Sequence, residues 1–329
     1  MPKYMVKALV LGFGLFTAMQ TQAVSAVSED ITLTISTFNG LASCWADPKY
    51  YPVNPYKGAT PYGYLLTGNR IEGIKKEVDE LKAAGVDVMC FQEMTDEMYG
   101  VISAELGHVY SGFMSYHDIS YWAGYQLDPQ KPVRNGNATF VNESKWQILS
   151  HQDVASYPSN GSGNHAVYTK IKSSRGSSRV FHVMNVHLDS DTGGRRKNEL
   201  EGVLGILSPS FGSANDTQVL VGDFNCATTH ASVQRTLSAS EFINTKKPLE
   251  ATHPFTVSYN NNQIYASIDH INVRNGTAVG DTAVWSHGLW VTYPFQNPND
   301  PKEAMRIVDN FGICGSDHFP VVGSVKAPV

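Results

Sequence analysis

The sequence predicts a layered α/β fold, in which helices cover the faces of β-sheets. Residues 69–84 have the helical spacing of apolar residues and are followed, after one glycine, by the apolar segment 86–91, which has the composition of a buried strand. Strand-like and helix-like segments continue along the chain without an internal repeat or a Pro/Gly/Ser-rich linker. With 329 residues, 42% of them hydrophobic and 17% charged, the chain suits one large or two ordinary domains with ample core.

The first 26 residues have the layout of a secretory signal peptide. Lys3 and Lys7 precede an apolar run, and the small residues Ala23 and Ala26 offer cleavage points. The run is shorter than the about 20 residues that a membrane span needs, although an uncleaved anchor remains the alternative. We therefore expect residues 1–26 to be removed, residues 27–329 to form the folded domain, and the protein to be secreted or periplasmic. Removal takes away two lysines and no acid, so the net charge changes from −5 to −7.

The N-terminal part of the mature chain begins with a strand. Apolar and polar residues alternate over 31–38, which predicts a half-buried strand ending at Asn39. The stretch 41–68 is rich in Tyr, Pro and Gly and follows neither period, so we expect a long loop that packs on the body or serves the function. Apolar residues on one face then predict the helix 69–84, which ends at Gly85.

The middle of the chain is predicted to be rich in strands. The strand 86–91 is followed by a second helix at 96–106, and the aromatic, irregular stretch 107–134 is expected to be another loop. Two hairpins are predicted after it, the first from strands 136–141 and 146–149 around a polar bend, and the second from strands 166–171 and 180–188 around a short basic turn.

The C-terminal part alternates helices and strands again. We expect helices at 195–207 and 232–237 and strands at 219–223, 266–273 and 321–325. The strand 219–223 ends in Gly222-Asp223-Phe224-Asn225. In extended backbone, Asp223 and Asn225 point to the same side and together can hold a hard cation or position a water molecule. The alternative is an Asp-Asn turn that only ends the strand.

Other polar residues stand at or within predicted strands. Glu93 follows the strand 86–91, and His187 lies near the end of the strand 180–188. Asp269 lies within an apolar strand, where a carboxylate is costly unless it is paired. Asp317 and His318 are adjacent just before the final strand, and an acid that orients a histidine is the usual arrangement for a general base.

Motifs of several other site classes are absent from the sequence. There is no Walker A loop, no GxGxxG motif opening a helix and no GxSxG nucleophile elbow. The spacing of Cys44, Cys90, Cys226 and Cys314 fits no zinc pattern. Export would permit disulfides, but their pairing stays open, and Cys90 can simply be a core residue.

Six short motifs together resemble the endonuclease/exonuclease/phosphatase superfamily, which includes DNase I-like nucleases, neutral sphingomyelinases and inositol-polyphosphate 5-phosphatases. They occur in the order of that family and cover residues 38–320, nearly all of the mature chain. The motifs are Phe38-Asn39-Gly40, Gln92-Glu93, Asn185-Val186-His187-Leu188, Gly222-Asp223-Phe224-Asn225, Ile268-Asp269-His270-Ile271 and Ser316-Asp317-His318-Phe319-Pro320.

The resemblance implies a four-layer α/β/β/α sandwich of two mixed β-sheets flanked by helices, with the site at one end. It also implies a metal site at Asn39, Glu93 and Asp317, in which Glu93 is the main ligand. The expected ion is Mg²⁺, with Mn²⁺ or Ca²⁺ as alternatives.

The same resemblance gives each catalytic residue a role. His318 would be the general base that takes a proton from water, and Asp269 would orient it. Asp223 and Asn225 would position the water and bind the phosphate, and His187 would stabilise the charge that develops on phosphoryl oxygens. If His318 has its ordinary pKa of about 6.5, activity should rise through mildly acid pH.

The substrate is expected to be a phosphodiester, and Arg134 and Asn137 resemble the places where relatives contact it. A secreted DNase I-like nuclease acting on DNA or RNA is favoured. A sphingomyelinase-type phospholipase C is an alternative, in which aromatic loops such as Tyr50-Tyr51 and Tyr121-Trp122 meet a membrane. An inositol-phosphate phosphatase and a non-catalytic binding protein also stay open. Nothing in the sequence indicates an obligate protein partner.

Overall fold

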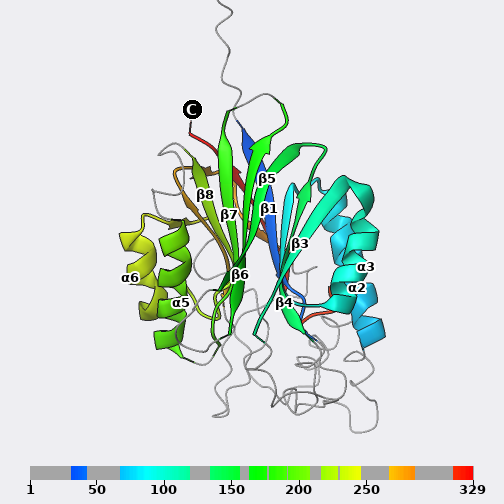
Figure 1. Ribbon diagram of the computed structural model, residues 1–329, viewed down its shortest axis with the longest axis horizontal. Coiled ribbons are helices and arrows are strands. Elements are labelled where there is room, and N and C mark those ends of the chain that lie inside the picture. Colours follow the sequence, from blue (N-terminus) through cyan, green and yellow to red (C-terminus); the bar gives the residue numbers. More distant parts are fainter. Residues whose placement is uncertain are drawn as a thin grey trace, which may run out of the picture.

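The computed structural model describes residues 31–42, 67–118, 134–155, 163–175, 178–190, 192–207, 216–228, 230–245, 267–285 and 314–328. These residues form two β-sheets that pack face to face, with helices on both outer sides (Figure 1). The helices α2 and α3 cover one sheet, and α5 and α6 cover the other. The four-layer α/β/β/α sandwich is therefore confirmed.

The first sheet has seven strands in its described part. Their order is β11-β13-β1-β2-β4-β3, and β12 also pairs with β13. The pair β1–β2 is parallel and the other pairs are antiparallel. The strands are β1 (Thr32–Asn39), β2 (Val88–Thr95), β3 (Tyr110–Tyr116), β4 (Asn135–Asn142), β11 (Thr277–Ala278), β12 (Ala283–Val284) and β13 (Val321–Lys326).

The second sheet has six strands in the part of the chain that the structure describes. Their order is β5-β6-β7-β8-β10-β9, and only β7–β8 is parallel among these pairs. The strands are β5 (Trp146–Ala155), β6 (His165–Ser173), β7 (Val180–His187), β8 (Thr217–Asp223), β9 (Ile243–Asn244) and β10 (Asp269–Arg274).

The helices lie where the apolar spacing predicts them, within two residues. Each of two helices begins at a threonine whose side chain accepts a hydrogen bond from a backbone N–H of the first turn, Thr95 for α3 and Thr192 for α5. The helices are α2 (Thr67–Ala83), α3 (Asp96–Leu106), α5 (Gly193–Ile206) and α6 (Ala231–Ala239), and the short 3₁₀ turn η1 (Gly107–Val109) follows α3.

Three hydrophobic layers hold these elements together. The layer between the sheets is built from alternate residues of both, such as Ile35 and Val88 in the first sheet and Val183 and Val221 in the second. A second layer joins α2 and α3 to the first sheet, and a third joins α5 and α6 to the second. Cys90 lies in the layer between the sheets and is fully buried, which confirms its interpretation as a core residue.

Two expectations about the strands are wrong. Strands 136–141 and 146–149 do not form a hairpin, because β4 pairs with β2 and β3 whereas β5 pairs with β6 in the other sheet. The polar bend at 143–145 therefore crosses between the sheets. The stretch 107–134 contains the strand β3, whose aromatic residues Tyr110, Phe113 and Tyr116 recur every third residue and hide the two-residue period.

Several expectations fall outside the described residues. They include the signal peptide, most of the aromatic stretch 41–68, the pair Tyr121-Trp122 and the environment of Cys44. Where the structure describes the chain, no helix is both long and apolar enough to cross a membrane.

Candidate active site

The topology brings the polar ends of several strands to one end of the sandwich. Each sheet contains one parallel pair, so Asn39 of β1 lies beside Gln92 of β2, and His187 of β7 lies beside Asp223 of β8. The strand β10 runs antiparallel to β8 and begins at Asp269, directly opposite Asp223. The residues before β13 arrive at the same end, because β13 runs antiparallel to β1.

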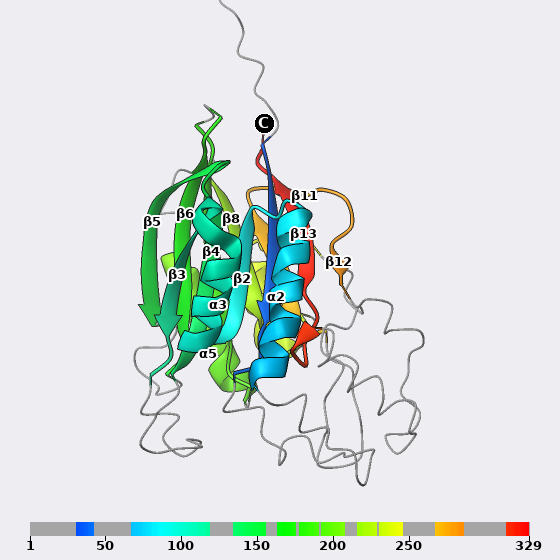
Figure 2. The same cartoon turned by 90° about the vertical axis from the view of Figure 1, so that its right-hand side faces the viewer.

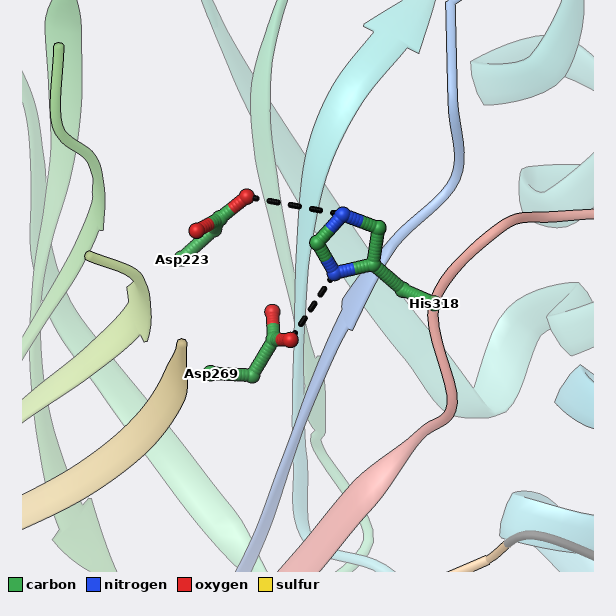
Figure 3. Close-up of side chains that lie close together, drawn as sticks. All are labelled: Asp223, Asp269 and His318. Atoms are coloured by element: carbon green, nitrogen blue, oxygen red, sulfur yellow. Dashed lines mark hydrogen bonds and ion pairs between the residues drawn. The ribbon is translucent and has the colours of Figure 1, made fainter. Parts of the chain in front are cut away.

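His318 is held between two carboxylates at this end (Figure 3). Its Nδ1 lies 2.8 Å from Asp269 Oδ2, and its Nε2 lies 3.7 Å from Asp223 Oδ2. The contact between Nδ1 and Asp269 is a hydrogen bond, which fixes the orientation of the ring. The second distance is longer than a direct hydrogen bond, so Nε2 faces Asp223 across a short gap.

His187 approaches the same carboxylate from β7. Its Nε2 lies 3.7 Å from Asp223 Oδ2 and 3.8 Å from Glu93 Oε1. The reactive nitrogens of two histidines, His187 and His318, thus converge on one oxygen of Asp223. All three residues are at least nine-tenths buried.

Asn39 joins the carboxylates of the two sheets. Its Nδ2 donates to Glu93 Oε1 at 3.1 Å and to Asp223 Oδ2 at 3.0 Å. Its Oδ1 accepts from the backbone N–H of Leu41 at 2.9 Å, which sets the orientation of the amide. In this arrangement Asn39 presents a donor to the site and spaces the two acids.

Glu93 owes its position to an irregularity in β2. The pairing of β2 with β4 shifts between Phe91 and Met94, and Glu93 has a φ of 55°. A β-bulge of this kind re-aims a side chain. The second carboxylate oxygen of Glu93, Oε2, accepts a hydrogen bond from the backbone N–H of Ala42 at 2.9 Å.

The end of β8 is a turn as well as part of the site. Asn225 has a φ of 51°, so the chain is no longer extended after Asp223 and the expected i, i+2 geometry does not hold. Asn225 N donates to Asp223 Oδ1 at 2.7 Å, and its Nδ2 donates to Leu188 O at 2.8 Å. The side chain of Asn225 thus ties the end of β8 to the end of β7.

The acids around His318 decide its protonation. Burial lowers the pKa of His318, but the hydrogen-bonded Asp269, together with Asp317 and a further carboxylate, outweighs it and raises the pKa to about 10. The expectation of a pKa near 6.5 is therefore wrong for the protein without a bound ion. Burial also raises the pKa of Asp223, and the charge of Asp269 adds to this effect.

The donor set fits a hard divalent cation. Ligand atoms of Asp223, Asp269 and His318 lie within 4.8 Å of one another. Asp269 Oδ2 and His318 Nδ1 already share a hydrogen bond. We therefore interpret Asp269 as the residue that orients the His318 imidazole, and do not count these two atoms as metal ligands. Glu93 and the buried Asp317, whose Oδ1 lies 3.9 Å from His318 Nε2, add carboxylate oxygens, which suit Mg²⁺, Mn²⁺ or Ca²⁺.

The two residues expected to bind substrate are engaged within the protein. Arg134 lies 3.3 Å from Asp96 Oδ2, and its guanidinium stacks 4.0 Å from the ring centroid of Tyr116. Asn137 is fully buried in β4, where its Nδ2 donates to His165 O at 2.7 Å. The contacts described for these two residues do not involve the residues around His318, so their role in substrate binding stays a prediction.

Two residues near the site were not predicted from the sequence. The ring of His117 lies 5.8 Å from that of His187, and its Nδ1 accepts from the backbone N–H of His165 at 3.0 Å. Burial, with the nearby His187 and His165, lowers the pKa of His117 well below its ordinary value, so the ring is neutral. The other residue is Arg70, which lies four residues before Ile74 and therefore on the buried, apolar face of α2. No motif marks either position.

Comparisons with known proteins agree with this architecture. The profile of the Endonuclease/Exonuclease/phosphatase family matches residues 69–318. An endonuclease/exonuclease/phosphatase from Bacteroides vulgatus is 15% identical over 91% of this chain and 100% of that chain, with a TM-score of 0.61. The human Nocturnin catalytic domain, solved with a bound sulfate anion, is 17% identical over 91% of this chain and 96% of that chain, with a TM-score of 0.59.

A further similar structure is ANGEL2, a 2′,3′-cyclic phosphatase solved with adenosine-2′,3′-vanadate. It is 15% identical over 91% of this chain and 97% of that chain, with a TM-score of 0.61. At such identities the likeness shows the fold alone. No curated protein sequence matches the chain.

Members of the matched family are hydrolases that act on phosphoester bonds, and they generally depend on a divalent metal ion. The family profile covers well over half of the chain and includes most of the residues gathered at the end of the sandwich. The protein therefore belongs to the endonuclease/exonuclease/phosphatase family of phosphoester hydrolases.

Proposed function

We propose that the protein is a secreted, Mg²⁺-dependent phosphodiesterase that cleaves nucleic acid by attack of water on phosphorus. The observation that carries this proposal is the convergence of His187 Nε2 and His318 Nε2, each 3.7 Å from Asp223 Oδ2. A water molecule or a phosphoryl oxygen in that gap would be within reach of both rings. Secretion rests on the basic-apolar-small layout of residues 1–26.

In the proposed reaction, His318 in its neutral form takes a proton from the attacking water at Nε2. Asp269 accepts from Nδ1–H, which favours the tautomer with an unprotonated Nε2 and stabilises the imidazolium that forms. Asp223 orients the water, and His187 donates from Nε2 to the phosphoryl oxygen on which charge develops. As the water oxygen bonds to phosphorus, the bond between phosphorus and the leaving ester oxygen breaks, and that oxygen takes a proton from solvent.

Glu93, Asp317 and Asn39 surround the place where the divalent ion would be held. When bound, the ion would offset negative charge on a phosphoryl oxygen, and its own charge would counter the acids that raise the pKa of His318. In the chain itself, Asn39 bridges Glu93 and Asp223 by donating a hydrogen bond to each. The ion preferred by the enzyme is proposed as Mg²⁺ because the donors are oxygens.

Nucleic acid is the proposed substrate because family members act on phosphoesters such as nucleic acids. ANGEL2, a structural neighbour, binds an adenosine-2′,3′-vanadate, whereas another neighbour from Bacteroides thetaiotaomicron is a mannosyl-6-phosphatase. The fold thus serves both diesters and monoesters in other proteins. Only a direct comparison of substrates distinguishes the nuclease from a sphingomyelinase-type enzyme or an inositol-phosphate phosphatase.

The test measures hydrolysis of plasmid DNA, sphingomyelin vesicles and inositol polyphosphates in parallel, each with Mg²⁺ and with EDTA. We expect metal-dependent DNA nicking that is lost in His318→Ala and kept in His108→Ala, a matched change of an exposed histidine. Cleavage of vesicles without nicking would replace the nuclease by a lipid phosphodiesterase, and cleavage of inositol phosphates alone would replace it by a phosphatase. No hydrolysis of any ester would overturn the catalytic proposal in favour of a binding role.

A further inference from the structure

Arg70 occupies an unusual place for an arginine. It lies on α2, far from any residue with an assigned role in the sequence, and only 1% of its surface is exposed. Its Nε donates to Gly315 O at 3.0 Å, and its Nη2 donates to Gly40 O at 2.7 Å and also to Leu41 O. One guanidinium therefore holds the backbone of two loops that are distant in the sequence.

The first of these loops carries Asn39. Leu41 has a φ of 54°, an uncommon conformation for a residue with a side chain, so the loop needs outside support. Leu41 N donates to Asn39 Oδ1, and Ala42 N donates to Glu93 Oε2. The position of this backbone thus sets the position of both Asn39 and Glu93.

The second loop carries Asp317 and His318. Ser316 Oγ donates to Asn39 O at 2.6 Å, and the backbone N–H of His318 donates to Ser316 Oγ at 3.1 Å. The oxygen of Gly315 that Arg70 binds therefore lies one residue before the serine that links the two loops. Moving this oxygen would move His318 away from Asp269.

The backbone of α2 also lies directly against the second loop. A Cβ added to Gly73 would lie 2.6 Å from Gly315 N, and one added to Gly315 would lie 2.0 Å from Arg70 O. Figure 2 shows α2 in front of β1 and β13, the strands from which the two loops extend, and α2 packs on the sheet that contains them. Residues 70 and 73 share one helical face, three positions apart.

We propose that Arg70 is a positioning residue, which sets the distance between the metal-side loop at 39–42 and the histidine loop at 315–318 through their carbonyl oxygens. Arginine suits this task because its planar fork directs several donors at fixed angles, whereas lysine offers one flexible nitrogen. The inference rests on the proposed hydrolytic function, and it deepens that function by naming a residue that acts without touching the substrate.

The kinetic test compares Arg70→Ala with Arg274→Ala. Arg274 is the matched control, because it also binds backbone carbonyls, with Nη1 3.0 Å from Ser240 O and Nη2 on Leu207 O, but at the opposite end of β10 from Asp269. With the best substrate found, we expect kcat of Arg70→Ala to fall about 10- to 100-fold with KM changed less than threefold, the loss typical of partners that orient site residues. Added guanidinium ion should restore part of kcat, and urea of the same concentration should not.

A second variant perturbs the same contact without removing the cation. Gly73→Ala should lower kcat in the same way, whereas Gly100→Ala on α3 should not, because a Cβ at Gly100 meets nothing within 4 Å. If kcat falls in Arg70→Ala and Gly73→Ala only in proportion to their loss of thermal stability, as in the controls, then the residues are merely structural and the proposal is wrong.

An NMR measurement separates failure of this inference from failure of the proposed function. The Nδ1–H proton of His318, bonded to Asp269, should give a downfield resonance in the wild-type protein that is missing in His318→Asn. We expect it to shift or broaden in Arg70→Ala and to stay in Arg274→Ala. This result would support positioning even if no substrate were cleaved, and an unchanged resonance in a folded Arg70→Ala protein would overturn it.

Discussion

The surroundings of His318 oppose its proposed role as a general base. The carboxylates that orient its ring also favour its protonated form, so the protein without an ion holds an imidazolium at neutral pH. An imidazolium cannot accept a proton from water. In the proposed mechanism, a bound cation would lower the pKa of His318 by opposing the charge of these carboxylates.

The raised pKa of His318 predicts how stability changes with pH in EDTA. A group whose pKa is higher in the folded than in the unfolded protein stabilises the fold below its unfolded value of about 6.5, and this contribution is lost as pH rises through the folded value. The folded value is about 10. The free energy of unfolding should therefore fall between pH 6.5 and 10.

Urea denaturation of wild type and His318→Gln at pH 6 and pH 10 measures this effect. We expect the substitution to be clearly destabilising at pH 6 and much less so at pH 10. An equal destabilisation at both values would mean that His318 titrates normally in the folded protein.

Asp269 gives a second prediction for the same residue. Its charge and hydrogen bond are the largest effects that raise the pKa of His318, so Asp269→Asn should lower that pKa. The acid limb of the pH–rate profile should then move to lower pH while the maximal rate falls, because the ring is less well oriented. A limb that does not move when measured with saturating Mg²⁺ would exclude His318 as the group that controls the rate.

At the level of the elements, the sequence predicted most of the fold. Helices α3 and α5 carry both the apolar spacing and a threonine cap, and the strands β1 and β8 show clear alternation or a continuous apolar run. The partner of each strand could not be predicted, because a short polar bend such as 143–145 serves equally for a hairpin and for a crossing between sheets. Pairing depends on which faces are buried, and both β4 and β5 offer a face to the space between the sheets.

The residues of the site were predicted from motifs, but the hydrogen bonds that connect them were not. Asp269 and His318 are 49 residues apart, and only the antiparallel pairing of β10 with β8 and of β13 with β1 brings them within hydrogen-bond distance. Arg70 and His117 were missed because their partners are backbone atoms or lie in other elements. Arg70 lies on the apolar face of its helix, but the sequence does not show whether the guanidinium of such an arginine is paired inside the protein or extends to solvent.

The strand β8 contains a glycine that no other residue can replace. Gly222 has a φ of 142°, and a Cβ at this position would lie 1.9 Å from Val186 O of the parallel neighbour β7. Gly222→Ala should therefore destabilise the protein by several kcal/mol, about 4 or more, which is the range of the most severe single substitutions.

The measurement is a urea denaturation midpoint, with Gly205→Ala as control. Gly205 lies in α5 and a Cβ there meets nothing within 4 Å, so alanine should stabilise the helix by about 1 kcal/mol. A Gly222→Ala protein as stable as wild type would contradict the close approach of β7 and β8.

For the whole molecule, the gathering of acids at one end predicts that a divalent ion stabilises the fold. An ion at 100 times its dissociation constant adds about 2.7 kcal/mol to the free energy of unfolding, which corresponds to a few degrees in melting temperature. We expect this rise with Mg²⁺ or Mn²⁺ in the wild type. It should be absent in Glu93→Gln and present in Glu97→Gln, which changes an exposed glutamate on α3. An equal rise in melting temperature in all three proteins would mean that the ion does not bind at Glu93.

The pairing of β1 with β13 has a consequence for the order in which the protein becomes active. Thr32 lies opposite Lys326, so residues from the two ends of the described chain stand side by side in one sheet. The N-terminal part of a protein leaves the ribosome first, so β1 can pair early with β2 but has to wait for β13 until the other described elements have emerged. His318 arrives with that same late segment. A nascent chain, or one that terminates before this segment, would hold Glu93, His187 and Asp223 without the residue that is proposed to activate water.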